Sequence, residues 1–193
     1  MLGRYLLKRL MIGSQKGGKP IISHQMALNP QSKSTPVRTV FNSSQVYRGY
    51  SLNSSWSLGP EDIMNNLLRI LVRFREDTVG AQGDITKMYY MIRICAEEQM
   101  MQLFIWKFEG EEEIRTFCMT RLGMVNKISS NFSIIAVNDT AELEDFPTRY
   151  PDAHEALPEN TYVDNVLVVK GTLEEMKATI ERIEFVSAKE GFY

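Results

Sequence analysis

The stretch that decides the fold is residues 159–170, "ENTYVDNVLVVK". In it Asp164 lies between an aromatic–valine pair and four consecutive apolar residues, "VLVV". Apolar flanks of this kind belong in a core, where a charged carboxylate costs free energy unless something compensates it. Asp and Asn are turn-forming residues. The pattern therefore predicts a tight hairpin with residues 163–165 at its tip, and it raises the question of what compensates Asp164.

A second carboxylate, Asp84, ends another strand-like run, residues 80–85. If the two strands join one sheet, Asp84 and Asp164 meet at neighbouring strand ends, where they repel each other unless divalent cations lie between them. Mg²⁺ prefers oxygen ligands and leaves room for phosphate oxygens. Two such ions can stabilise the attacking and leaving oxygens of a phosphoryl transfer. The alternative is that both residues only form turns.

Length and composition are those of an ordinary soluble globular chain, with 193 residues, 44% hydrophobic and 24% charged. This length allows one large domain or two small ones. Cys95 and Cys118 have no disulfide or metal-type spacing, so we expect a reducing, cytoplasmic location. No apolar run approaches the roughly 20 residues that span a bilayer, so no membrane partner is expected.

Charge is distributed unevenly although the net charge is only −2. Residues 1–50 hold eight Lys or Arg and no acid, which leaves 14 basic against 24 acidic residues, a balance of −10, for the rest. A basic lobe of this kind favours a polyanionic partner. Residues 1–19 are expected to form a poorly structured arm. Their basic, apolar opening leaves a targeting segment as an alternative.

Periodicity predicts several further elements. Residues 36–41 are typical of a strand, and residues 102–120 of a hairpin around an acidic loop. A helix is expected to begin with Pro60 at its first position and to continue to residue 77. Thr172 and Glu175 form a capping box in front of a final helix.

Three segments are less regular. Residues 20–35 are expected to be loop, because they lack periodicity and contain turn-forming residues. The apolar run at residues 131–137 fits a helix or a strand equally well. Residues 139–159, with three prolines, predict a loop or a broken helix.

Two other motifs do not support a site. Residues 13–20, "GSQKGGKP", approach a phosphate-binding loop, but Pro20 stands where a Ser or Thr hydroxyl is needed for magnesium. His24 and His154 are the only histidines, and neither has a Cys or a second His at ligand spacing. Both are expected to be surface or loop residues.

The hairpin motif "YVDN" resembles the YxDD hairpin of reverse transcriptases, and residues 83–90, "GDITKMYY", resemble their first catalytic strand, "ADIxKMF". Residues 32–44, "SKSTPVRTVFNSS", resemble the fingers segment "KTTPxRVVFDAS". Residues 49–76 are similar to "GxSLNDxLxxGPdLxxxLxxxLxRFR", and residues 103–123 to "LRFLWR…YRMTRV". Five matches in sequence order point to the Pao/BEL group of LTR retrotransposon polyproteins.

This resemblance covers roughly residues 20–193 and implies an α+β fold, a fingers–palm fragment in which helices pack on one face of a small antiparallel sheet. The chain ends where the family continues into thumb, connection and RNase H regions, so we expect fingers and palm alone. The implied activity is RNA-directed DNA polymerisation. Its partners would be an RNA or DNA template with a primer, and deoxynucleoside triphosphates.

The resemblance also implies roles for single residues. Asp84 and Asp164 would be catalytic and bind two magnesium ions, with Asn165 as a weaker ligand. Arg38 and Lys33 would contact the triphosphate, since a guanidinium suits phosphate geometry. The other implied positions are an aromatic that excludes a ribose 2′-hydroxyl, Tyr89, and three residues near template or primer, Tyr162, Asn126 and Ser130.

Several residues depart from the family pattern. Asn165 replaces the second Asp of YxDD, and Val125 and Asn126 replace a Phe-Gly pair. Asn131 stands in place of Pro, and Asn42 in place of a frequent Asp. These departures leave a second hypothesis open, a decayed or captured transposon fragment without catalysis that binds nucleic acid at most. A third hypothesis is an unrelated interaction domain.

Overall fold

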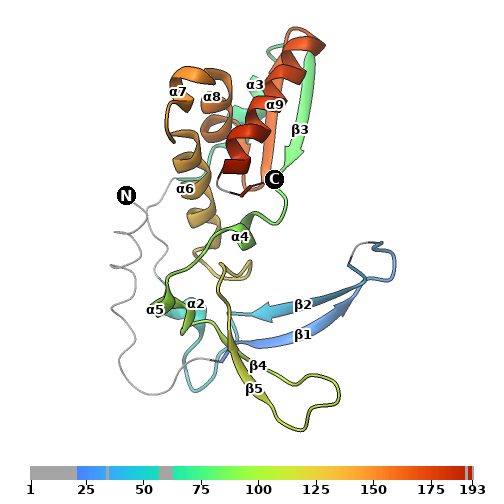
Figure 1. Ribbon diagram of the computed structural model, residues 1–193, viewed down its shortest axis with the longest axis vertical. Coiled ribbons are helices and arrows are strands. Elements are labelled where there is room, and N and C mark those ends of the chain that lie inside the picture. Colours follow the sequence, from blue (N-terminus) through green and yellow to red (C-terminus); the bar gives the residue numbers. More distant parts are fainter. Residues whose placement is uncertain (1–20, 34, 57–62, 190, 193) are drawn as a thin grey trace. The chain divides into compact units, whose positions relative to one another are not determined.

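The computed structural model describes residues 21–33, 35–56, 63–189 and 191–192. The chain divides into two units (Figure 1). The first unit comprises residues 1–59 and 93–129, and the second unit comprises residues 60–92 and 130–193. The expected arm, residues 1–19, lies outside the described residues.

The sheet of the second unit is antiparallel, with the strand order β3 (Val79–Asp84), β7 (Asn165–Lys170) and β6 (Thr161–Tyr162). Val166 and Val168 are buried, whereas their neighbours along β7 are half-buried. This alternation turns one face of the sheet to the core. The predicted hairpin is confirmed, but its turn contains only Val163 and Asp164, because Asn165 already belongs to β7.

Helices cover the buried face of this sheet. They are α6 (Ser129–Ala141), α7 (Phe146–Arg149), α8 (Pro151–Glu159) and α9 (Leu173–Lys189). Figure 1 shows α9 running alongside β3, and both α8 and α9 contact β7. The apolar side chains buried between helices and sheet include Val137, Phe146, Leu157, Val166, Val168, Met176 and Val186. The expected α+β arrangement, with helices on one face of an antiparallel sheet, is confirmed.

Three helices, α6, α7 and α8, take up most of the segment from residue 129 to residue 159. The run that fitted a helix or a strand is a helix of 13 residues, α6. For residues 139–159 the broken-helix alternative is the one observed. Pro147 and Pro151 stand in the first turns of α7 and α8, where a missing N–H costs no hydrogen bond. Prolines therefore start these helices as well as interrupting the segment.

Helix α3 (Leu67–Arg73) is shorter than predicted. Residues 57–62, with the expected start at Pro60, lie outside the described residues, and residues 63–66 are not helical. The Asn66 Oδ1 accepts hydrogen bonds from the backbone N–H groups of Leu68 (2.9 Å) and Arg69 (3.3 Å), and so caps the helix. The neighbouring Asn65 Nδ2 donates to the Pro158 and Thr161 carbonyls. The residues before residue 67 have helical periodicity but do not form a helix, because the side chains of two asparagines hydrogen-bond to the backbone there.

The first unit contains two hairpins, β1 (Ser23–Leu28) with β2 (Val37–Asn42), and β4 (Leu103–Trp106) with β5 (Arg115–Cys118). It also contains the short helices α2 (Leu52–Ser55) and α5 (Ala96–Gln99). The predictions for residues 36–41 and 102–120 are confirmed. The loop expected for residues 20–35 is wrong, because it contains β1. Strand β1 has no β-branched residue, no apolar alternation and mostly exposed side chains, so its sequence does not identify it as a strand. Its pairing with β2 defines it.

A buried polar network joins three separate segments of the first unit. Asn126, Ser43 and Gln102 are 5%, 2% and 1% exposed. The Ser43 Oγ donates to the Asn126 Oδ1 (2.6 Å), and the Asn126 Nδ2 donates to the Gln102 Oε1 (2.5 Å). A Cβ on Gly123 would lie 3.1 Å from that Gln102 oxygen, so the backbone passes close to the network.

Among the residues that the structure describes, no helix has both the length and the apolar composition required to cross a bilayer.

Removing the Asn126 amide should destabilise the first unit. In Asn126→Ala the buried hydroxyl of Ser43 and amide of Gln102 lose their partner, at a cost of about 1–3 kcal/mol for each unsatisfied group. Urea denaturation measures the difference. The control is Lys127→Ala, an exposed neighbour whose backbone N–H, not its side chain, bonds to Asn53. Equal stability of the two variants would contradict a structural role for the network.

Asp152 should contribute to stability in a pH-dependent way. Burial raises its pKa, but hydrogen bonds from Thr179 and Arg182 and the charge of Arg182 outweigh this, so that the pKa is lower than usual. Because the pKa is lowered in the folded state, the contribution is present above the unfolded pKa of about 3.9 and is lost as the pH falls through the lower folded value.

We expect Asp152→Asn to cost about 1.5–3 kcal/mol at pH 7, the range for hydrogen bonds to a charged group. The difference from the wild type should shrink below pH 4, which thermal unfolding across pH measures. Glu184→Gln, an exposed carboxylate of α9, is the control. A difference that stays constant with pH would show that the Asp152 charge has no part in it.

Candidate active site

The two predicted catalytic residues lie on adjacent strands. Asp84 is the last residue of β3, and it is paired with Asn165, the first residue of β7. The Ile85 N–H donates to the Asp164 carbonyl at 2.7 Å. The backbone therefore brings Asp84 and Asp164 together at one end of the sheet, although they are 80 positions apart in the chain.

The side chains at this end share the sheet face opposite the helical core. Directly opposed residues of antiparallel strands project to the same face. Asp84 thus shares its face with Asn165 and, through the β6–β7 pairing, with Tyr162. Asp84 is exposed and Asp164 is half-buried. Neither residue is buried, and partial exposure answers how a charged Asp164 is tolerated beside apolar residues.

The turn that carries Asp164 has an unusual backbone. Val163 has a φ of 57°, in the left-handed region that β-branched residues rarely adopt. Such a residue costs about 1–3 kcal/mol and persists only where the surrounding structure imposes it. Here the pairing of β6 and β3 with β7 imposes it.

Asn165 is hydrogen-bonded on both sides. Its Nδ2 donates to the Asp164 Oδ1 at 2.9 Å, and its Oδ1 accepts from the Gln82 Nε2 at 2.6 Å. Gln82 was not among the predicted site residues. The signal that could have found it is the two-residue period of a strand, which places Gln82 on the same face as Asp84.

The donor set at this end of the sheet consists of oxygen atoms. No cluster of three or more His, Cys, Asp or Glu able to hold a metal occurs in the described part of the chain. His24 lies in β1 against the rings of Phe41 and Trp106, and His154 pairs with Glu142 at 2.7 Å. The candidate ligands are thus two carboxylates, those of Asp84 and Asp164. Hard oxygens of this kind suit Mg²⁺, which usually takes one or two carboxylates and completes its shell with water and phosphate.

The remaining predicted residues are divided between the two units. In the second unit, Tyr89 lies half-buried in α4 (Met88–Met91), and Ser130 lies half-buried near the start of α6. In the first unit, Asn126 is buried, and its amide is engaged by Ser43 and Gln102.

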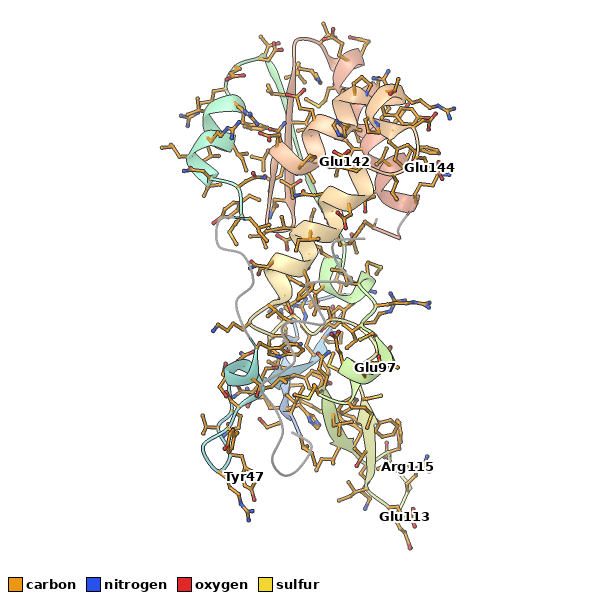
Figure 2. All side chains as sticks on the ribbon, turned by 90° about the vertical axis from the view of Figure 1, so that its left-hand side faces the viewer. Tyr47, Glu97, Glu113, Arg115, Glu142 and Glu144 are labelled. Carbon is orange, nitrogen blue, oxygen red and sulfur yellow. The ribbon has the colours of Figure 1, made fainter. Side chains whose placement is uncertain are left out.

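Lys33 and Arg38 belong to the β1–β2 hairpin of the first unit. Lys33 lies in its loop and Arg38 is paired with Ala27, and both side chains are exposed. Within the described residues neither makes a salt bridge. The same unit also contains the acidic β4–β5 loop. Figure 2 labels Glu113 of this loop and Arg115, the first residue of β5, which pairs with Glu111. The first unit therefore combines a basic hairpin with an acidic one.

Comparison with solved structures identifies the fold of this chain. No family model and no curated protein matches the sequence. Among solved structures, a foamy viral protease-reverse transcriptase in complex with double-stranded DNA matches with a TM-score of 0.66 and 16% identity, over 97% of this chain and 28% of that chain.

A foamy viral protease-reverse transcriptase in complex with an RNA/DNA hybrid gives a TM-score of 0.62 and 18% identity, over 97% of this chain and 21% of the other. A further complex with double-stranded DNA gives 0.61 and 18%, over 97% and 33%. The chain thus spans between a fifth and a third of the length of these neighbours. The described residues of this chain have a reverse-transcriptase-like α+β fold.

Proposed function

We propose that this chain is the fingers and palm portion of an RNA-directed DNA polymerase of the Pao/BEL retrotransposon type. The first unit would correspond to fingers and the second to palm. The observation that supports the proposal is the pairing of Asp84 with Asn165 in the β3–β7 ladder, which brings the backbones of Asp84 and Asp164 to the same end of the sheet.

In the proposed reaction a primer 3′-oxygen attacks the α-phosphorus of a deoxynucleoside triphosphate, a phosphodiester bond forms, and diphosphate leaves. Asp84 and Asp164 would hold two magnesium ions, with Asn165 as the weaker third candidate. When bound, such ions would activate the hydroxyl and neutralise phosphate charge.

The other residues would bind and select substrates. Arg38 and Lys33, exposed on the β1–β2 hairpin, would contact triphosphate oxygens, for which a guanidinium has the matching geometry. Tyr89 would exclude a ribose 2′-hydroxyl. Template and primer would lie near Tyr162, Asn126 and Ser130.

A second candidate function is nucleic-acid binding without catalysis. Asn165 favours it, because an amide with both polar atoms hydrogen-bonded stands where the family has a carboxylate. The basic hairpin would serve this function equally well.

Primer extension separates the two candidates. We expect magnesium-dependent incorporation of deoxynucleotides by the chain, and a loss of about 100-fold or more in Asp84→Asn, because metal-bound charge is worth several kcal/mol in such a transition state. Asp139→Asn, an exposed Asp of α6, is the matched control. Undiminished incorporation by Asp84→Asn would refute the catalytic assignment. No incorporation by the wild type, together with salt-sensitive primer–template binding, would favour the second candidate.

Binding to primer–template should depend on the basic hairpin. Each lost phosphate contact reduces the slope of log K against log salt by about one. The double substitution Lys33→Ala/Arg38→Ala should therefore weaken binding and lower this slope by up to about two in fluorescence anisotropy titrations. Lys177→Ala, an exposed cation on α9, should leave both unchanged. Unaltered binding by the double variant would place the contact elsewhere.

A further inference from the structure

We propose that Gln82 and Asn165 are positioning residues: Gln82 orients the Asn165 amide, which in turn holds the Asp164 carboxylate for its ligand. The inference rests on the proposed function and assigns Asn165 a role other than direct metal ligation. Its basis is the continuous hydrogen-bonded chain from Gln82 through Asn165 to Asp164.

The chemistry of the three side chains fixes the direction of these two hydrogen bonds. An ionised carboxylate only accepts hydrogen bonds, so the amide nitrogen of Asn165 must face Asp164. The Asn165 oxygen then faces Gln82, which must present its nitrogen as the donor. Both hydrogen bonds form only in this one arrangement. The opposite orientation would set the Asn165 oxygen against a carboxylate oxygen.

This arrangement has a consequence for the donor set. The Asn165 Oδ1 is engaged by Gln82 at 2.6 Å, and would have to leave that bond to ligate an ion. One oxygen of Asp164 has a fixed donor, which restricts the rotation of the carboxylate and leaves its second oxygen for a ligand. Groups that orient a metal ligand in this way typically change metal affinity 10- to 100-fold when they are mutated.

The length of Gln82 is essential to the contact. Gln82 is paired with Leu167, so it reaches Asn165 along a diagonal of the ladder. Diagonal neighbours lie about 7–8 Å apart, with their Cβ atoms somewhat closer, which is within reach of long side chains. Gln82→Asn keeps the amide group but shortens the side chain by one methylene. The variant should therefore lose the hydrogen bond to Asn165 while keeping the same donor group.

The test uses the whole chain and two readouts other than activity. The first is the side-chain amide NMR signal of Asn165. We expect this signal to shift in Gln82→Asn and to remain unchanged in Gln25→Asn, an exposed glutamine of β1. An unchanged signal in Gln82→Asn would overturn the inference.

The second readout is affinity for Mn²⁺ alone, measured by paramagnetic line broadening at Asp84 and Asp164. Gln82→Asn and Asn165→Ala should each lower it about tenfold, and the double variant should lose no more than either single variant. Loss in Asn165→Ala with no loss in Gln82→Asn would overturn the inference in favour of direct ligation by Asn165. Equal affinity in all variants would also overturn it. Absence of Mn²⁺ binding by the wild type would instead count against the proposed function.

Discussion

The register between β3 and β7 is the constraint on which the candidate site depends. With Asp84 opposite Asn165, the two acidic residues reach the same end of the sheet, and Val166 and Val168 project into the helical core. A slip of one residue would reverse every side chain of β7, burying Asn165 and exposing both valines. Packing of the hydrophobic core therefore also fixes the register of the candidate site.

The hairpin "YVDN" and the final helix were predictable because their signals are local. A turn-forming pair between apolar runs predicts β6–β7, and Thr172 with Glu175 forms the expected capping box, with the Glu175 N–H donating to the Thr172 Oγ1. The convergence of Asp84 and Asp164 was predicted from the resemblance and from the strand-like character of both segments. The ladder places Asp84 opposite Asn165, the residue after Asp164.

The sequence was uninformative where structure comes from distant partners. Strand β1 has no apolar alternation and is defined by pairing with β2. Asn65 and Asn66 make the predicted helix begin later than expected, through hydrogen bonds that periodicity does not register. Gln82 could not be predicted as a site residue, because exposed glutamines are common on strands. Only its hydrogen bond to Asn165, 83 positions later in the chain, connects it to the candidate site. The roles of all the predicted site residues, Asp84 and Asp164 included, remain predictions.

The left-handed backbone of Val163 places a conformational cost immediately beside Asp164. Glycine at that position would relieve the cost, yet it would also give the turn many more accessible shapes. A branched side chain leaves few alternatives once the flanking strands are paired. The left-handed residue thus costs the hairpin some free energy but limits the positions that the Asp164 carboxylate can take. This restriction comes from the main chain and not from tight packing.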